Sequence, residues 1–265
     1  MSRLLGLLMV LVPTASTIAA DTIAARNLPS YEIQRAGMPI TVDGRLDEPA
    51  WVAAPSFGPF AFPWFKEGTK EQTVAKMLWD DKHVYIAHIC QDAHITARHA
   101  NHDDPIPEDD CFEVMMAPDA ARPNRYYNIE WNLLGGYVDG HRPDGASGPR
   151  APWDVRGLRV GETHVGEINN DEGVDSYWIC EVAVLLSNFA GDMPRTPPEA
   201  GDEWRLNFNR HGGDVNMQYS QWSPADTPAP TFHTPETFGR VIFSARTSPF
   251  ASGERELTTS AGPAP

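Results

Sequence analysis

Basic residues and cysteines are scarce in this sequence, and both shortages limit what the protein can be. Lys and Arg number 21 against 36 Asp and Glu among 265 residues, which gives a formal net charge of −15. A strongly negative chain repels phosphate backbones, so we do not expect nucleic-acid binding. Cys90, Cys111 and Cys180 allow three single disulfide pairings or none, and each lies in an apolar run where a buried free thiol is the alternative.

Long helical patterns and long apolar runs are also missing. No stretch after the N-terminus is apolar over the roughly 20 residues that a membrane-spanning helix needs, so we expect no membrane span. The 24 prolines are scattered along the chain, which disfavours a helical bundle, and no amphipathic pattern of ten residues separates the strand-like runs. The 41% hydrophobic content is nevertheless sufficient for a folded core.

The N-terminus has the pattern of a secretory signal. Arg3 precedes an apolar run over residues 4–12, and small residues follow as far as Ala19 and Ala20. A basic start, a short apolar segment and a small-residue cleavage site are typical of export signals. We therefore expect cleavage near Ala19 or Ala20 and a periplasmic or extracellular protein; a buried strand or short helix is the alternative interpretation.

What the sequence contains instead is a series of short apolar-polar alternations separated by turn residues, which predicts an all-β sandwich or barrel. We expect a signal peptide over 1–20, a linker over 21–30, a single domain over 31–245 and a disordered tail over 246–265. One short helical turn is expected within 46–54, with Pro49 near its start. The expected strands are 31–35, 40–42, 57–62, 73–79, 84–91, 111–117, 126–133, 137–139, 155–165, 176–184, 205–209, 218–222 and 240–243.

Two of these strands show their faces clearly. Residues 84–90 are mostly apolar on both faces of the expected strand, which predicts a central strand covered on both sides. Residues 127–133 place aromatic and aliphatic side chains at odd positions, whereas Asn128, Glu130 and Asn132 occupy the even positions. The second pattern predicts one packed face and one polar face.

Several segments resemble, in the same order, the carbohydrate-binding modules of family 9 and their relatives. The resemblance is carried by ITVDGRLDEPAW at 40–51, LWDDKHVYIA at 78–87, DDCFEVMM at 109–116, YWICEVAV at 177–184, residues 201–209, SQWSP at 220–224 and PETFG at 235–239. It implies a β-sandwich of jelly-roll type that binds sugars, often beside xylan-degrading enzymes, and that holds structural calcium.

The same resemblance implies a sugar site made of two tryptophans with polar groups between them. Glu113 matches the glutamate that contacts ligand in the family. Pro107 stands at the position of the first tryptophan, and Phe232 stands near that of the second. The arginine of the neighbouring strand falls near Asn128 or Glu130.

Sugar recognition needs aromatic faces against the C–H groups of the ring and carboxylates or amides on its hydroxyls. Our candidate carbohydrate-binding residues are therefore polar side chains of two strands together with aromatic groups farther along the chain. Glu113 could instead be a solvated carboxylate or a calcium ligand, and Trp222 could be a core residue. Trp153 is a further candidate wall of the site. Four other tryptophans are assigned to the core: Trp51, Trp79, Trp178 and Trp204. The set of candidate carbohydrate-binding residues is Glu113, Asn128, Glu130, Asn132, Trp222, Phe232 and His233.

One loop is crowded with acidic residues. Calcium prefers six to eight oxygen ligands and often takes them from such loops, so Asp103, Asp104, Asp109 and Asp110 are candidate calcium ligands. A solvated acidic loop is the alternative. The spacing of His94, His99 and His102 in and before this loop matches no common metal motif.

Other functions remain open at this point. Glu113 and Glu130 could be the paired carboxylates of a glycoside hydrolase. His88, Met115, Met116 and Met217 could ligate haem b in an electron-transfer sandwich, and a binding domain for a protein or another non-sugar ligand is a third possibility. The sequence favours an exported, non-catalytic carbohydrate-binding protein of carbohydrate catabolism.

Overall fold

The computed structural model of this chain describes residues 27–248, so the expected signal peptide and most of the expected tail lie outside it. The described residues form eleven strands, one short α-helix and three short 3-10 helices. None of these helices is long and apolar enough to cross a membrane. In chain order they are β1 (Ser30–Arg35), α1 (Pro49–Ala53), β2 (Thr73–Trp79), β3 (His83–Gln91), η1 (Ile106–Glu108), β4 (Cys111–Ala117), β5 (Tyr126–Asn132), β6 (Tyr137–Arg142), β7 (Arg159–Val165), β8 (Tyr177–Leu185), η2 (Leu186–Phe189), β9 (Glu203–His211), β10 (Tyr219–Gln221), η3 (Pro235–Thr237) and β11 (Gly239–Thr247).

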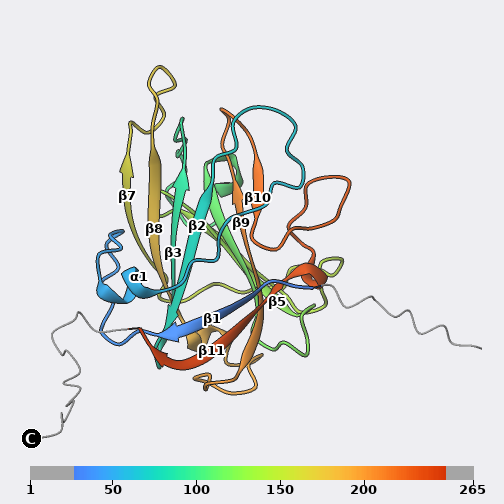
Figure 1. Ribbon diagram of the computed structural model, residues 1–265. Coiled ribbons are helices and arrows are strands. Elements are labelled where there is room, and N and C mark those ends of the chain that lie inside the picture. Colours follow the sequence, from blue (N-terminus) through green and yellow to red (C-terminus); the bar gives the residue numbers. More distant parts are fainter. Residues whose placement is uncertain (1–26, 249–265) are drawn as a thin grey trace, which may run out of the picture.

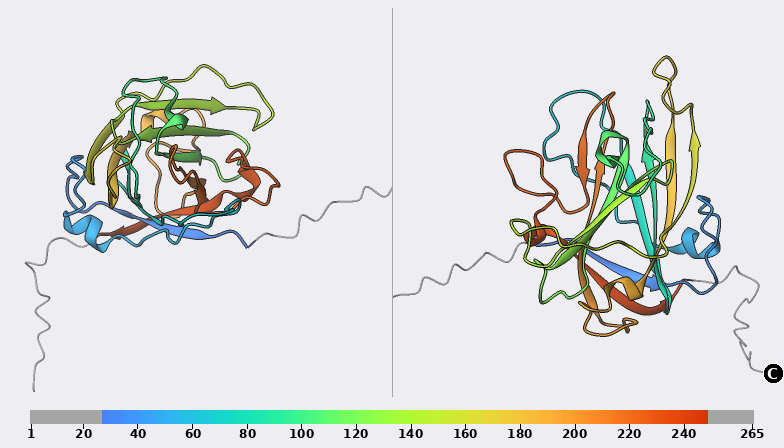
Figure 2. Two further views of the ribbon diagram at one scale, coloured as in Figure 1. Left: turned by 90° about the horizontal axis from the view of Figure 1, so that it is seen from above. Right: turned by 180° about the vertical axis from the view of Figure 1, so that it is seen from behind.

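All eleven strands belong to one sheet, in the order β6-β5-β4-β9-β11-β1-β2-β3-β8-β7, with β10 paired to β9. Strand β1 runs parallel to both of its neighbours, whereas the other pairs are antiparallel. Strands β1 and β11 join the two halves of the sheet at the lower end of the molecule (Figure 1). Seen from above, the sheet curls so that its halves face each other (Figure 2).

The space between the two halves is filled by one hydrophobic core. Alternating residues of β4, such as Phe112 and Val114, meet alternating residues of β3 and β8, such as Ile86 and Val182, and all four are fully buried. Two layers of sheet around a shared core form a β-sandwich, which confirms the predicted all-β fold with short helical turns.

Strand β3 is covered on both sides, as its sequence predicts. Ile86 points into the main core, whereas Tyr85 and Ala87 pack in a second cluster beneath α1 around Trp51. The buried carboxylate of Glu181 ties this cluster together, because its Oε1 accepts a hydrogen bond from Trp51 Nε1 at 2.7 Å. Its Oε2 accepts backbone N–H groups of the turn at Asp43 (3.0 Å) and Gly44 (3.3 Å).

Two predicted strands are wrong. Residues 40–42 form no strand, because the Thr41 amide bonds the side chain of Glu48 rather than a neighbouring strand. Residues 57–62 contain only an isolated bridge at Ala61. Pro59 has no N–H to donate there, and the segment is held by the burial of its aromatic side chains.

Tryptophan and cysteine placement follows the sequence analysis. Trp51, Trp79, Trp178 and Trp204 are at most 2% exposed, which confirms their assignment to the core. The three cysteines lie buried with free thiols in the described part of the chain.

A buried charged cluster holds one end of the sandwich together. Arg210 of β9 is 1% exposed and lies 2.9 Å from Asp92 and 3.4 Å from Glu71. Asp110 is 3.8 Å away and accepts backbone N–H groups of Thr96 and Gly213. The carboxylates therefore connect loops from both halves of the sheet through one guanidinium group.

Candidate functional site

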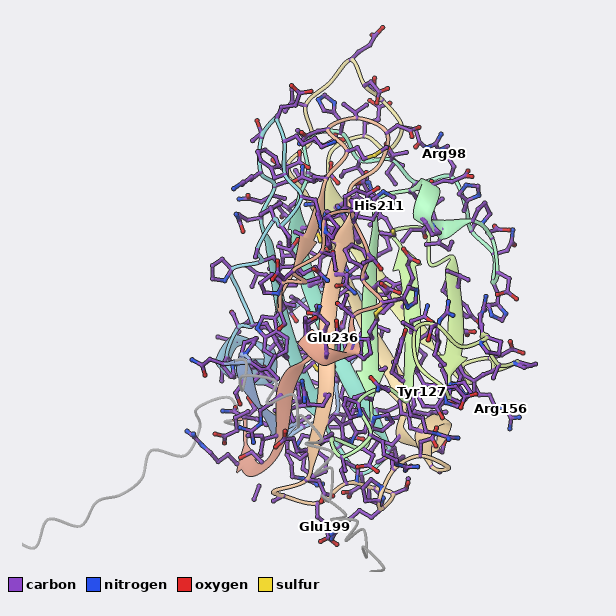
Figure 3. The ribbon with its side chains drawn as sticks, turned by 90° about the vertical axis from the view of Figure 1, so that its right-hand side faces the viewer. Arg98, Tyr127, Arg156, Glu199, His211 and Glu236 are labelled. Atoms are coloured by element: carbon purple, nitrogen blue, oxygen red, sulfur yellow. The ribbon has the colours of Figure 1, made fainter. Side chains whose placement is uncertain are left out.

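The face of β4 and β5 that points away from the core carries the polar side chains. Alternation places Phe112 and Trp131 in the core and Glu113 and Glu130 on the opposite face. This outer face continues over β6, β9 and β10, which pair alongside. Figure 3 views the molecule from this side, with His211 toward its upper end and Glu236 near the middle.

Strand register aligns four polar side chains in a row across this face. Glu113 lies opposite Glu130 on one side and opposite Asn209 on the other. Asn209 in turn lies opposite Gln221 of β10. Because lateral neighbours in a sheet are about 4.8 Å apart, the row is continuous over four strands.

Hydrogen bonds fix the orientation of this row. Gln221 Nε2 donates to Asn209 Oδ1 at 2.9 Å, and Asn209 Nδ2 donates to Glu113 Oε2 at 3.1 Å. The Cys111 thiol donates to Glu130 Oε1 at 2.9 Å. Gln221 and Asn209 have no exposed surface, and Glu113 and Glu130 keep only 5% and 9%, so the two carboxyl groups are the part of the row nearest to solvent.

The two carboxyl groups influence each other's protonation. Burial, followed by repulsion from Glu130, raises the pKa of Glu113 well above its usual value. Burial also raises the pKa of Glu130. Like charges on directly opposite residues are unfavourable, so the pair favours a state in which one carboxyl group is protonated. Such a pair offers both a hydrogen-bond donor and strong acceptors.

Further polar groups surround the open end of the row. Asn128 follows on β5, opposite Met115 and Gly140. Tyr126 lies opposite Arg142 of β6, and its hydroxyl group is 2.8 Å from His233 Nδ1. Burial, with the nearby Arg142, lowers the pKa of His233 to about 4, so its imidazole is neutral at pH 7.

An aromatic group lies beside these polar residues. The ring of Phe232 is 6.0 Å from Trp64 and 6.0 Å from Tyr219, and Tyr219 stacks on His211 at 4.7 Å. Trp64 Nε1 donates to the carbonyl of Thr227 at 2.8 Å, which anchors the indole to the loop before Phe232. Trp64 and Tyr219 also line an open groove of ≈ 680 Å³.

Pro107, which stands at the position of the family's first tryptophan, lies near His211, the residue on which Tyr219 stacks. Pro107 and His211 line a hollow of ≈ 250 Å³, and Met217 lines both this hollow and the groove beside Trp64.

The structure brings five of the seven predicted binding residues to this outer face around the open carboxyl groups. Trp222 lies instead in the core, 8% exposed, with its ring 4.7 Å from Phe57, so it does not form a wall of the site. Asn132 is fully buried: its amide donates to His99 and Asp109, and its oxygen accepts N–H groups of the following turn. Both positions correct the expected set. The five residues at the site are Glu113, Asn128, Glu130, Phe232 and His233.

Trp153, the further candidate wall, is also absent from this face. It packs against the core beside Tyr127, at 4.7 Å between ring centroids.

Three functional candidates were not found from sequence. Trp64 lies in an irregular loop, where no periodicity assigns it a face. Asn209 and Gln221 lie in predicted strands, but their contact with Glu113 depends on which strands pair. The sequence signal for Asn209 is its alternation with Phe208, which places the two side chains on opposite faces of β9.

The four expected calcium ligands do not converge on one point. Asp109 Oδ2 accepts hydrogen bonds from Arg98, His99 and Asn132, and both Asp110 oxygens accept backbone N–H groups. Asp104 Oδ2 accepts the backbone and side chain of Asn101. These hydrogen bonds organise the loop, and the four carboxylates are not gathered at one point among the described residues, so calcium binding here stays a prediction. In residues 27–248, the group of side chains with metal-ligand spacing is His102, Asp103 and Asp154.

The residues considered as alternative haem ligands are packed in the protein interior, except for Met217. His88 is fully buried, stacks on Phe112 at 4.0 Å, and its Nε2 accepts a hydrogen bond from Trp131. Burial lowers its pKa well below the usual value, so it is a neutral core residue. Met115 and Met116 point to opposite faces of β4, and Met217 is 60% exposed in a loop.

Comparison with known proteins identifies the family of this chain. The sequence model of carbohydrate-binding family 9 matches residues 63–243, which span both strands of the carboxyl pair and the aromatic group. The chain belongs to carbohydrate-binding family 9. No match to it was found among curated proteins.

Solved structures with the same fold include members of this family. A candidate carbohydrate-binding protein from Bacteroides uniformis has a TM-score of 0.66 at 19% identity, over 81% of this chain and 99% of that one. A family 9 module from Caldicellulosiruptor kristjanssonii in complex with cellotriose has a TM-score of 0.56 at 15% identity, over 82% and 95%. Its complex with glucose gives the same TM-score and identity, over 82% and 97%.

Proposed function

We propose that this family 9 protein binds a carbohydrate on the outer face of β4 and β5, without catalysing a reaction. The observation that carries the proposal is the row of polar side chains that ends in the pair Glu113 and Glu130, beside the aromatic group of Trp64, Tyr219 and Phe232. Carboxyl and amide groups bond adjacent hydroxyls, and aromatic rings cover C–H faces of a sugar.

Trp64 supports this proposal because it restores a tryptophan to the site. The chain has Pro107 and Phe232 at the family's two tryptophan positions, yet Trp64 comes from a separate loop to lie against Phe232. The bound glucose and cellotriose of the structurally similar module make β-linked glucose sugars the first ligands to test.

The placement of the two carboxyl groups supports binding rather than hydrolysis. Glu113 and Glu130 are directly opposite on neighbouring strands, so both face the same side of a ligand. Glycoside hydrolysis needs both carboxyl groups within reach of the scissile bond, whereas these two are only 5% and 9% exposed. Release of reducing sugar from a polysaccharide, abolished in Glu113→Gln, would instead establish the hydrolase alternative.

Calorimetric titration with glucose, cellotriose, xylo-oligosaccharides and other sugars tests the proposal. We expect heat of binding with at least one sugar, and about a tenfold loss of affinity (about 1.4 kcal/mol) in Trp64→Ala. The control is Tyr177→Ala, which removes an aromatic side chain that is 37% exposed on β8. No heat with any sugar, or equal affinity in Trp64→Ala and wild type, would refute it.

Export and a role in carbohydrate catabolism are part of the same proposal. The basic start, apolar run and small residues at the N-terminus support export. Fractionation of cells that express the full-length chain tests it: the protein should appear outside the cytoplasm and lack its first 19 or 20 residues.

A further inference from the structure

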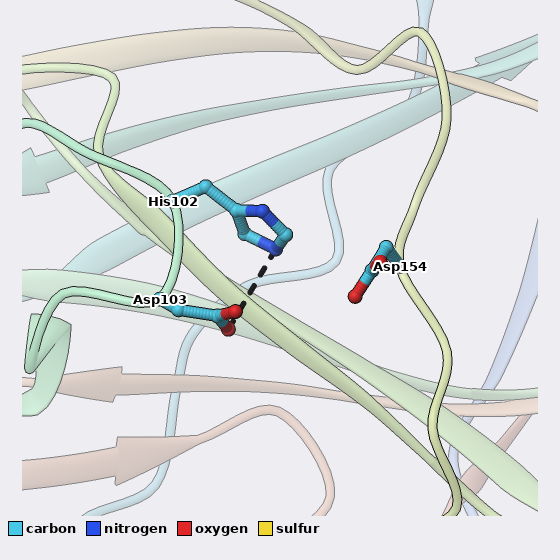
Figure 4. A group of neighbouring side chains, drawn as sticks. All are labelled: His102, Asp103 and Asp154. Atoms are coloured by element: carbon cyan, nitrogen blue, oxygen red, sulfur yellow. Dashed lines mark ion pairs between the residues drawn. The ribbon is translucent and has the colours of Figure 1, made fainter.

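We propose that His102, Asp103, Asp139 and Asp154 form a binding site for a divalent transition cation of the zinc class. The ligand atoms of His102, Asp103 and Asp154 lie within 4.8 Å of one another, and all three side chains are exposed (Figure 4). They come from the loop that precedes η1 and the loop that follows β6, so the site exists only in the folded chain.

Asp139 of β6 places a further carboxylate next to His102. Its side chain is fully buried, and its Oδ2 lies 3.5 Å from His102 Nε2. Its Oδ1 is buried and has no hydrogen-bond partner among the described residues. The Arg150 guanidinium is 3.9 Å from this oxygen, too far for a hydrogen bond, and a bound metal would place a cation closer to the buried carboxylate.

The backbone holds these groups in place. His102 forms a bridge with Tyr137 at the start of β6, and its ring stacks on the Tyr137 ring at 4.4 Å. The amide next to Asp154, that of Val155, donates to Asp139 Oδ2 at 2.9 Å. Both loops are therefore fixed to the same strand, and little ordering is needed when a cation binds.

The donor spacing and chemistry fit a small borderline cation. His102 Nε2 is 3.6 Å from Asp103 Oδ1 and 3.5 Å from Asp139 Oδ2. A tetrahedral ion with ligand bonds of about 2.1 Å has ligands about 3.4 Å apart. An imidazole with three carboxylates suits zinc-class ions, whereas calcium prefers oxygen ligands alone and more of them.

Arg150 is the present counter-charge of this cluster. Its guanidinium lies 3.6 Å from Asp103 and 3.9 Å from Asp139, and it is 45% exposed. A bound dication would compete with this group. Removal of Arg150 should therefore strengthen metal binding. If the cluster were only a structural group of ion pairs, removal of Arg150 would not increase its affinity for a metal ion.

Titration of the tag-free protein with Zn²⁺ after chelator treatment tests the site. We expect one Zn²⁺ per chain, at least tenfold weaker binding in His102→Ala and Asp154→Asn, and several-fold tighter binding in Arg150→Ala. His164→Ala is the matched control, since His164 is a partly exposed histidine 3.4 Å from a carboxylate of Glu162.

The thermal midpoint of each variant without metal reports its folding, and both His102 and Asp154 are exposed, so we expect these midpoints to match wild type. A visible absorption band of bound Co²⁺, lost in His102→Ala, would confirm nitrogen ligation independently. Absence of Zn²⁺ binding, or equal binding in wild type, His102→Ala and Asp154→Asn, would overturn the proposal. Binding of Ca²⁺ alone would overturn it as well.

Discussion

Replacement of Glu113 by Gln separates a binding role of the carboxyl pair from a structural one. The side chain keeps its size, and an amide next to Glu130 removes the repulsion between two buried carboxyl groups. Asn209 Nδ2 can still donate to the remaining oxygen at this position, where it now lies 3.1 Å from Glu113 Oε2. The variant should therefore fold, and its stability and affinity should change in opposite directions.

The stability change follows from the raised pKa of Glu113. Above the usual glutamate pKa of 4.5 the unfolded chain has released a proton that the folded chain retains, so stability falls as pH rises through the raised value. Each unit of difference between the two pKa values corresponds to about 1.4 kcal/mol. Glu113→Gln removes this loss, so we expect the variant to gain stability relative to wild type, and to gain more at pH 8 than at pH 4.

The affinity change has the opposite sign. Above the raised pKa, where Glu113 is ionised, a hydrogen bond from a sugar hydroxyl to this charged acceptor contributes about 1.5–3 kcal/mol, and a neutral amide gives back only part of it. We therefore expect sugar binding to weaken by about tenfold or more.

Urea unfolding at pH 4 and pH 8 and calorimetry with the sugar identified for the wild type measure both quantities. Glu236→Gln is the control, since Glu236 is an exposed carboxylate in η3 on the same side of the molecule (Figure 3). Unchanged affinity in Glu113→Gln, or a joint fall of stability and affinity, would refute the reasoning.

Two further predictions concern the framework of the sandwich. Burial raises the pKa of Glu181 to about 7. The contribution of Glu181 to stability is therefore full below about pH 4.5 and falls as the pH rises to 7. The full pKa shift corresponds to about 3.4 kcal/mol, and solvent access to the turn should reduce this loss of stability to about half. Urea titrations from pH 4.5 to 8 should show this slope in wild type and a flatter one in Glu181→Gln, and equal slopes would contradict the assignment. Arg210→Met leaves three buried carboxylates without their cation and should cost about 3–5 kcal/mol in unfolding free energy. By contrast, Arg240→Met breaks an exposed pair with Glu203 and should cost less than about 1 kcal/mol, so similar costs would show that the buried cluster is not critical.

The strands were predictable where alternation is strong and turn residues bound the run. Residues 73–79 and 111–117 are strands with the predicted ends, and the predicted helical turn begins at Pro49. Prediction was wrong for residues 40–42 and 57–62, where apolar spacing resembles a strand but the backbone forms no continuous ladder with a neighbouring strand. Apolar spacing reports burial, and burial alone does not decide whether the backbone pairs.

The candidate site was predictable in part for the same reason. Glu113, Asn128 and Glu130 share a face because alternation within β4 and β5 dictates it. Trp222 was misplaced because an aromatic residue beside a short strand can face either way. The environment of Trp222 depends on Phe57, which is far away in sequence.

Local sequence determined which segments become strands, which side chains share a face, and that the outer face of β4 and β5 is polar. Only the tertiary structure decided that Asn209 and Gln221 continue the row from Glu113, that Trp64 lies beside Phe232, and that His102 meets Asp139 and Asp154. The physical reason is that periodicity depends on neighbours along the chain, whereas lateral contacts depend on pairing between strands. Asn209 and Glu113 are 96 residues apart, so their contact exists only after the whole sheet has closed around its core.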